Sequence, residues 1–184
     1  MKILLSITGA SLATIGLTLL ENLIKFSDAK LYAIVSDGAK VVLQKENNFT
    51  IDLSNYPSVT FFDDKNLYSA PASGSFQIDK TIIAPCSMNT LAKISSGISD
   101  TLTTRAAAVA LKEKRELILA PREMPYSTIS LSQMTALSKL GVIIAPPVLG
   151  GYSGTTNLEQ MQEFIVGKWL DLLGVRHEIY KRWS

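Results

Sequence analysis

Five short apolar runs of strand length recur along the chain, and small or turn-forming residues follow each of them. They cover residues 3–7, 31–35, 81–84, 117–120 and 142–145. Continuous apolar runs of this length are typical of strands that are buried on both faces, as in a parallel sheet. The pattern therefore predicts five buried parallel strands.

Between these runs the apolar residues recur at the spacing of amphipathic helices. One stripe comprises Leu12, Ile15, Leu19, Leu20 and Leu23, and another comprises Leu158, Met161, Ile165, Trp169 and Leu172. Strands that alternate with helices favour an α/β fold, here a three-layer, doubly wound parallel sheet of the flavodoxin or Rossmann type.

The segment 47–80 breaks this rhythm, because it carries Pro57, Pro71 and Gly74. We expect an irregular strand at 59–62 and loop elsewhere. Long loops within compact domains are often functional. Asp63 and Asp64 are interpreted as solvated loop residues.

Length and composition limit the architecture and the class of partner. A chain of 184 residues with 47% hydrophobic residues is long enough for one domain with a substantial core, which we expect to span residues 1–184. The net charge is +2, and the Lys and Arg residues are scattered. This distribution argues against a nucleic-acid or anionic-membrane partner. The mean hydropathy of +0.21 indicates surplus apolar surface and hence a homo-oligomer.

Cysteine usage and the amino-terminal residues bear on localisation. Cys86 is the single cysteine, so no intrachain disulfide can form, which favours the cytoplasm. Gly9, Ser11, Thr14 and Gly16 interrupt the apolar stretch that ends at Leu20. The stretch therefore falls short of the ~18 to 20 apolar residues of a membrane span, and we expect neither a span nor a secretory signal.

Polar and small residues follow the predicted strands, at the edge where open α/β sheets bind ligands. Helix N-termini at this edge offer N–H groups and a positive dipole end to a phosphate. Arg122 and Glu123 follow the fourth strand, and a glycine-rich loop with Tyr152 follows the fifth. The other candidates are Gly9, Ala10, Ser11, Ser36, Ser87, Met88, Asn89 and Thr90. We expect a phosphorylated ligand, although an ordinary turn at 8–11 and an Arg–Glu surface pair are alternative interpretations.

Several enzyme classes fit poorly. His177 is the single histidine and lies near the C-terminus, so a nucleophile–histidine arrangement has one possible base. Cys86 lacks a second cysteine for a zinc or redox pair. Asp63–Asp64 has no partner acidic motif for magnesium and diphosphate, and we expect no metal site.

Taken in order, the motifs of this chain resemble one family, the flavin prenyltransferases, within the wider group of flavodoxin-like, FMN-binding flavoproteins. The segments 86–90 and 121–123 are the most specific. The matching stretches are 7–11, 35–36, 72–76, 83–92, 97–100, 104–107, 111–113, 121–123, 146–147, 164–168 and 171–174. They span nearly the whole chain.

The resemblance implies a particular reaction. Reduced FMN is alkylated at N5 by dimethylallyl phosphate and then forms a ring at C6, without a metal. The product, prenylated FMN, serves a partner family of reversible decarboxylases of the UbiD type. Members of the family assemble as large homo-oligomers such as dodecamers.

The resemblance also implies roles for individual residues. Gly9, Ala10, Ser11, Ser36, Ser87, Met88, Asn89, Thr90 and Arg122 would hold FMN. Tyr152 and Lys168 would bind dimethylallyl phosphate, and Arg105 and Lys112 would assist. Glu46 and Glu123 would handle the proton, and shielding from water would give such a glutamate a raised pKa. Trp183 would add a π face for the five-carbon cation.

The chain departs from the family pattern at two positions. Asn89 stands where lysine is frequent, which weakens a charged contact to the flavin. Leu12 stands where glycine is frequent, and we interpret it as a packing change on the first helix.

Three other functions remain open from the sequence. A flavoprotein cysteine decarboxylase would need a histidine in the first half of the chain, which is missing. A flavodoxin-like electron carrier would have no use for Tyr152 and Lys168. An assembly subunit for the decarboxylase would keep FMN without prenylating it.

Overall fold

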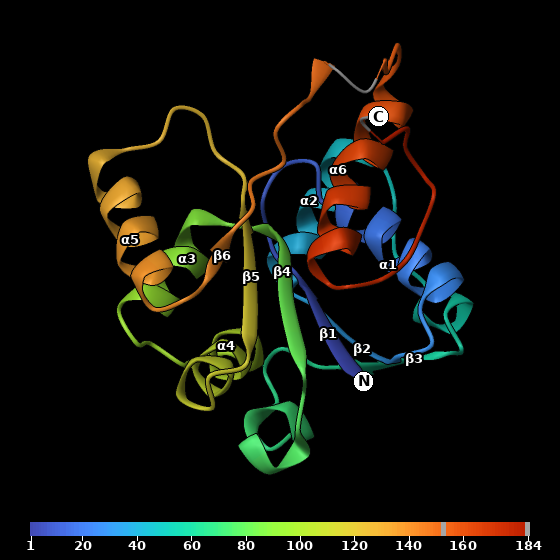
Figure 1. Ribbon diagram of the computed structural model, residues 1–184. Coiled ribbons are helices and arrows are strands. Elements are labelled where there is room, and N and C mark those ends of the chain that lie inside the picture. Colours follow the sequence, from blue (N-terminus) through green and yellow to red (C-terminus); the bar gives the residue numbers. More distant parts are fainter. Residues whose placement is uncertain (152–153, 183–184) are drawn as a thin grey trace.

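A parallel sheet forms the centre of the computed structural model, which describes residues 1–151 and 154–182 (Figure 1). Within these residues six strands follow the order β3-β2-β1-β4-β5-β6, and every neighbouring pair is parallel. The strands are β1 (Lys2–Ile7), β2 (Lys30–Val35), β3 (Val59–Phe62), β4 (Lys80–Cys86), β5 (Glu116–Pro121) and β6 (Ile143–Ile144). The five predicted apolar runs and the irregular strand are all confirmed, although β6 is shorter than predicted.

Helices cover both faces of the sheet, as the doubly wound fold requires (Figure 1). The helices are α1 (Thr14–Phe26), α2 (Asp37–Asn47), α3 (Met88–Ser95), α4 (Leu102–Lys112), α5 (Thr128–Lys139) and α6 (Leu158–Leu172). Side chains of α1, α2 and α6 share one buried apolar cluster with the sheet, and side chains of α3, α4 and α5 share another. The predicted α/β fold with three layers is therefore confirmed.

The segment between α2 and β4 contains more structure than predicted. It carries the short 3₁₀ helices η1 (Leu53–Asn55), η2 (Ala70–Ala72) and η3 (Gly74–Phe76). The Asp64 carbonyl oxygen accepts a hydrogen bond from Leu102 N at 2.7 Å. Its Oδ1 accepts one from Thr103 N at 2.8 Å. The solvated-loop interpretation of Asp64 was therefore wrong, because the first N–H groups of α4 have no partner within the helix and Asp64 supplies two acceptors.

Leu12 does not belong to the first helix, so its interpretation as a helical packing residue was also wrong. It precedes α1 and has a φ of 65°, in the left-handed region. Its side chain packs against the buried cluster around α1, which explains why it matched the apolar periodicity. A β-carbon disfavours this conformation, whereas glycine adopts it freely.

No helix in the described part of the chain combines the length and apolar character needed to cross a membrane.

Candidate active site

A cavity of about 530 Å³ lies at the carboxyl ends of β1, β2 and β4. Its walls come from the loops that follow these strands, from the segment before β4 and from the start of α4. The lining residues are Thr8, Gly9, Ser36, Asp37, Gly38, Asp64, Lys65, Ser87, Met88, Asn89, Thr90, Lys93, Thr101, Thr103 and Thr104. Six of the nine predicted FMN-binding residues line it, namely Gly9, Ser36, Ser87, Met88, Asn89 and Thr90.

A larger hollow of about 690 Å³ lies at the opposite, amino-terminal ends of β5 and β6. Its lining includes Lys114, Leu117 and Leu140, and none of the predicted site residues contributes to it. Because open α/β sheets bind ligands at the carboxyl edge, the smaller cavity is the candidate site.

Three helices begin at the cavity, and a hydroxyl group caps each of them. Ser36 Oγ accepts from Ala39 N at 3.1 Å at the start of α2. Ser87 Oγ accepts from Thr90 N at 3.2 Å in α3, and Thr101 caps α4. Each helix directs the positive end of its dipole and its first N–H groups toward this region, which is the arrangement that binds phosphate.

Thr8 joins the loops that follow β1 and β4. Its buried hydroxyl donates to the Pro85 carbonyl oxygen at 2.8 Å and accepts from Ser87 N at 2.8 Å. Since Ser87 is the N-cap of α3, this hydroxyl fixes one wall of the cavity against β1.

Gly9 lies directly against the start of α2. A β-carbon at Gly9 would lie 2.9 Å from the Gly38 carbonyl carbon, closer than such atoms approach in proteins. The two loops therefore pack backbone against backbone, and any side chain at position 9 would separate them.

Two lysines at the cavity were missed by the sequence analysis. Lys65 forms an ion pair of 2.5 Å with Asp37, and the Lys65 hydrogen bond holds the pKa of that carboxyl below its usual value. Lys93 pairs with Asp100 at 2.6 Å. Lys93 lies one helical turn after Asn89, so its spacing could have indicated it, because residues four apart share a helix face. Lys65 depends on the path of the segment before β4, for which the sequence carried no signal.

Glu46 lies beside the loop that precedes α1, at the same edge. Its Oε2 accepts from Leu12 N at 2.9 Å. This bond, a hydrogen bond from Ser11 and the charge of Arg122 together lower the pKa of Glu46. The raised pKa expected for a shielded glutamate is therefore wrong for Glu46, because its carboxylate is exposed and hydrogen-bonded in its charged form.

Arg122 leads out of β5 toward the cavity region, and its backbone N donates to the Cys86 carbonyl oxygen at 3.2 Å. Its Nε is buried without a hydrogen-bond partner among the described residues. Buried donors without a partner are costly, so this atom fits a role in holding a ligand. Glu123 is exposed, and its Oε1 accepts from Met124 N at 3.0 Å.

The remaining predicted residues lie outside the cavity lining. Ala10 is buried and Ser11 is half-buried in the loop that follows β1. The Arg105 guanidinium donates from Nε to the Ala72 carbonyl oxygen at 3.1 Å. Lys112 pairs with Glu113 at 2.9 Å at the far end of α4. That end is roughly 12 Å along the helix from Thr104, so one chain does not bring Lys112 to the cavity.

Lys168 borders a separate, mostly apolar hollow of about 350 Å³. Pro146, Leu149 and Trp169 contribute to its walls. Tyr152 and Trp183 lie outside the described residues. Within residues 1–151 and 154–182, no three His, Cys, Asp or Glu side chains gather where they could hold a metal ion.

The residues at the cavity fit FMN. Three capped helix N-termini suit its phosphate, and Gly9 and Gly38 line the cavity with backbone, without side chains that would obstruct a large planar ligand. The partnerless Nε of Arg122 provides a further donor at the same edge.

Comparisons with known proteins agree with this geometry. A family model described as "Flavoprotein" matches residues 1–170. The flavin prenyltransferase UbiX of Campylobacter jejuni is 53% identical over 187 residues, covering 100% of this chain and 99% of the relative.

Two solved structures share the fold over the whole chain. A structure described as a dodecameric FMN-dependent UbiX-like decarboxylase from Escherichia coli O157:H7 has a TM-score of 0.94 and 36% identity, covering 100% of both chains. AnUbiX (PadA1) in complex with FMN and dimethylallyl pyrophosphate has a TM-score of 0.93 and 33% identity, covering 100% of this chain and 97% of the other. With a family model over residues 1–170 and a full-length relative at 53% identity, this chain belongs to the flavoprotein family and, within it, to the flavin prenyltransferases.

Proposed function

We propose that this protein is a flavin prenyltransferase that joins the dimethylallyl group of dimethylallyl phosphate to N5 and C6 of reduced FMN. The observation that carries the proposal is the convergence of three capped helix N-termini on one cavity, in a chain of this family. The cavity offers a phosphate site, as FMN requires.

The bound flavin supplies the two atoms that are alkylated, and the protein binds and orients it. Ser36 and Ser87 cap the starts of α2 and α3, which would hold the FMN phosphate, and Arg122 would add a charged donor. The Glu46 carboxylate, whose pKa is lowered by the hydrogen bond from Leu12 N, is ionised near neutral pH. Glu46 is therefore available to receive the C6 proton, with Glu123 as the alternative acceptor.

Departure of the phosphate from the dimethylallyl group requires fixed cations and donors. We assign this role to Tyr152 and Lys168, with help from Arg105 and Lys112. A monophosphate leaving group carries less charge than a diphosphate, so these side chains can stabilise it without a metal ion. Ordered placement of donor and acceptor supplies much of the remaining rate enhancement.

We infer that the site is completed in a homo-oligomer. Lys112 lies at the opposite end of α4 from the cavity, so another copy of the chain would have to provide it. The similar E. coli protein is described as dodecameric. Met124, Ile129 and Leu140 expose 87%, 71% and 70% of their surface, which suits burial between subunits.

The destination of the product follows from the family resemblance. Prenylated FMN would pass to a UbiD-type decarboxylase, and both proteins would work in the cytoplasm.

Mass spectrometry of the flavin tests the proposal. Purified protein is incubated without oxygen with reduced FMN and dimethylallyl phosphate, and in parallel with the diphosphate, because AnUbiX was solved with the pyrophosphate. A flavin heavier by one isoprene unit is expected, strongly reduced in Lys168→Ala and retained in Lys139→Ala, a matched exposed lysine at the end of α5. Bound FMN that stays unchanged with both donors would contradict the transferase and favour an electron carrier or assembly subunit.

A further inference from the structure

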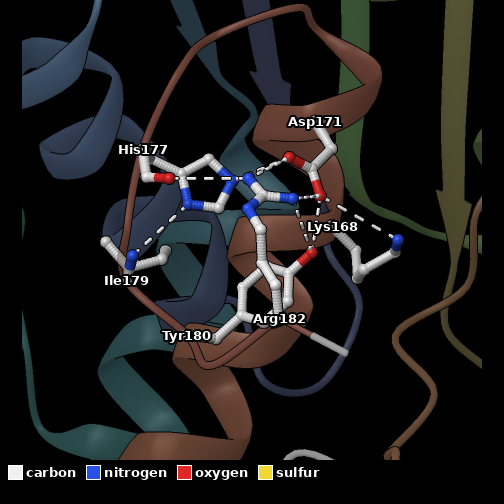
Figure 2. Close-up of polar contacts among 6 residues, drawn as sticks. All are labelled: Lys168, Asp171, His177, Ile179, Tyr180 and Arg182. Carbon is white, nitrogen blue, oxygen red and sulfur yellow. Dashed lines mark hydrogen bonds and ion pairs between the residues drawn. The ribbon is translucent and has the colours of Figure 1, made fainter. Parts of the chain in front are cut away.

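Asp171, near the end of α6, is the centre of a polar network that holds the C-terminal segment (Figure 2). The Arg182 guanidinium donates to Oδ1 at 2.8 Å and to Oδ2 at 3.2 Å, so it binds both carboxylate oxygens. The Tyr180 hydroxyl donates to Oδ2 at 2.6 Å, and His177 Nε2 lies 3.1 Å from Oδ1. Bidentate Arg–carboxylate pairs combine strength with a fixed geometry.

Packing holds the same segment against α6. The His177 side chain is 0% exposed. The Tyr180 ring packs edge-on against Phe164 with centroids 5.2 Å apart. A β-carbon at Gly167 would collide with that ring, so the segment needs glycine at this position. The C-terminal segment that carries His177 and Tyr180 is therefore packed closely against α6.

Lys168 lies one turn before Asp171 on the same helix. Its Nζ forms a long ion pair of 3.9 Å with Asp171 Oδ2, drawn as a dashed line in Figure 2. The Lys168 side chain is 52% exposed. Arg182 and Tyr180 already occupy Oδ2 at hydrogen-bonding distance, so the lysine stands at the edge of the network. Its ammonium can thus turn outward to an anion.

Loss of Arg182 would leave Lys168 as the nearest cation to the Asp171 carboxylate. Burial alone would raise the pKa of Asp171, but hydrogen bonds from Arg182 and Tyr180 lower it to about 2. The carboxylate therefore stays charged at neutral pH. With Arg182 removed, the flexible Lys168 side chain could shorten its 3.9 Å ion pair with Asp171 to hydrogen-bonding distance.

We propose that Arg182 is a positioning residue that occupies Asp171, keeps the Lys168–Asp171 ion pair long and so leaves the Lys168 ammonium available to bind the phosphate of the prenyl donor. The inference rests on the proposed function, because it takes Lys168 as a donor-phosphate ligand. It assigns the C-terminal segment a role in donor binding.

Steady-state kinetics of the full-length protein test this role. In Arg182→Ala the KM for dimethylallyl phosphate should rise about two- to fivefold, the range of an exposed ion pair, while kcat and FMN affinity stay constant. Arg182→Gln, which keeps a donor but no charge, should show the same rise with the segment in place. Arg176→Ala, a matched exposed arginine of the same segment, should leave KM unchanged.

The double variant Asp171→Asn/Arg182→Ala gives the sharpest outcome. Removing the carboxylate frees Lys168 again, so KM should return toward the wild-type value. If KM rises in Arg182→Ala and stays high in the double variant, Arg182 contacts the donor itself and the proposal is overturned. Unchanged KM in both Arg182→Ala and Arg182→Gln also overturns it.

A readout without turnover separates this inference from the proposed function. Acylation of Lys168 by an amine-reactive reagent, followed by mass spectrometry, should be slower in Arg182→Ala than in wild type, because pairing lowers the nucleophilicity of the amine. Lys139 serves as the internal reference. If the wild type forms no prenylated flavin, but Lys168 is labelled more slowly in Arg182→Ala than in wild type, the enzymatic proposal fails. The inferred effect of Arg182 on Lys168 is then still supported. Equal rates of Lys168 labelling in wild type and Arg182→Ala refute the proposed role of Arg182.

Discussion

Leu12 holds a left-handed backbone in the loop between β1 and α1, and its N–H is bound by Glu46. A non-glycine residue pays roughly 1–2 kcal/mol for this conformation. Here the Leu12 side chain offsets part of this cost, because it packs against the buried cluster around α1. Backbone strain and packing can be separated by two substitutions at the same position.

Leu12→Gly and Leu12→Ala remove the same packing, but only glycine relieves the strain. We expect Leu12→Gly to be more stable than Leu12→Ala by about 1 kcal/mol, the reverse of the usual order in which glycine is the less stable residue. Urea unfolding of both variants measures the difference. An alanine variant that is equally or more stable would argue against a strained Leu12.

Asp171 makes a pH-dependent contribution at the residue scale. Its folded pKa of about 2 lies below the usual 3.8, so its contribution is fully present above pH 3.8 and is lost as the pH falls toward 2. We expect Asp171→Asn to cost about 2 kcal/mol at pH 7 and progressively less below pH 3.8. Urea unfolding of wild type and variant at pH 7, 5 and 3 tests this. A cost that is constant across this range would contradict the depressed pKa.

At the scale of elements, the cavity exists because separate strands and helices are tied together by hydroxyl groups. Thr8 links β1 to the start of α3. The Ser6 and Thr103 hydroxyl oxygens lie 2.6 Å apart in the interior, where they join β1 to α4. The positions of the helix N-termini thus depend on a few buried polar contacts.

Thr8→Val keeps the shape of the side chain but removes its hydroxyl. The Ser87 N–H would lose its partner, whereas the Pro85 carbonyl oxygen would keep the hydrogen bond from Thr8 N at 3.2 Å. The wall formed by α3 should therefore loosen. We expect FMN affinity to fall about fivefold to tenfold, which corresponds to one net hydrogen bond. Fluorescence titration of FMN measures the change, with Thr60→Val on the exposed face of β3 as the control. Equal FMN affinity in wild type and Thr8→Val would show that the Thr8 hydroxyl does not shape the site.

At the scale of the whole molecule, one chain separates residues that the proposed reaction needs together. The cavity lies at the carboxyl edge of the sheet, whereas Lys112 lies just before β5 begins. A homo-oligomer resolves this separation if Lys112 and Lys168 of one site come from different copies. Complementation between two inactive variants can detect such sharing.

Lys112→Ala and Lys168→Ala should each be nearly inactive alone. When both are co-expressed with different tags and isolated as mixed oligomers, about a quarter of the sites would receive both intact lysines, and activity should recover accordingly. Prenylated flavin formed by the mixed sample is the readout, and light scattering gives the assembly mass. Mixed oligomers no more active than the separate variants would show that each site draws both lysines from the same chain.

The sequence predicted the sheet well, because strands buried on both faces leave continuous apolar runs such as residues 3–7 and 117–120. It also located six cavity residues, because the carboxyl ends of parallel strands meet at one edge. Apolar spacing wrongly assigned Leu12 to a helix, since the side chain is packed although the backbone is not helical. Lys65 was missed because it lies in an irregular segment, where no helical or strand spacing of apolar residues predicts the course of the chain.

Cys86 ends β4 next to the cavity wall, yet its thiol is fully buried. Burial raises its pKa to about 12, so the reactive thiolate is essentially absent at neutral pH. Peroxide formed when reduced flavin meets oxygen would find little to attack there. The chain is also a convenient background for spectroscopy. A cysteine introduced at the exposed position 45, near the end of α2, would be the one thiol that takes up a maleimide dye, and Cys86 would not need to be replaced first.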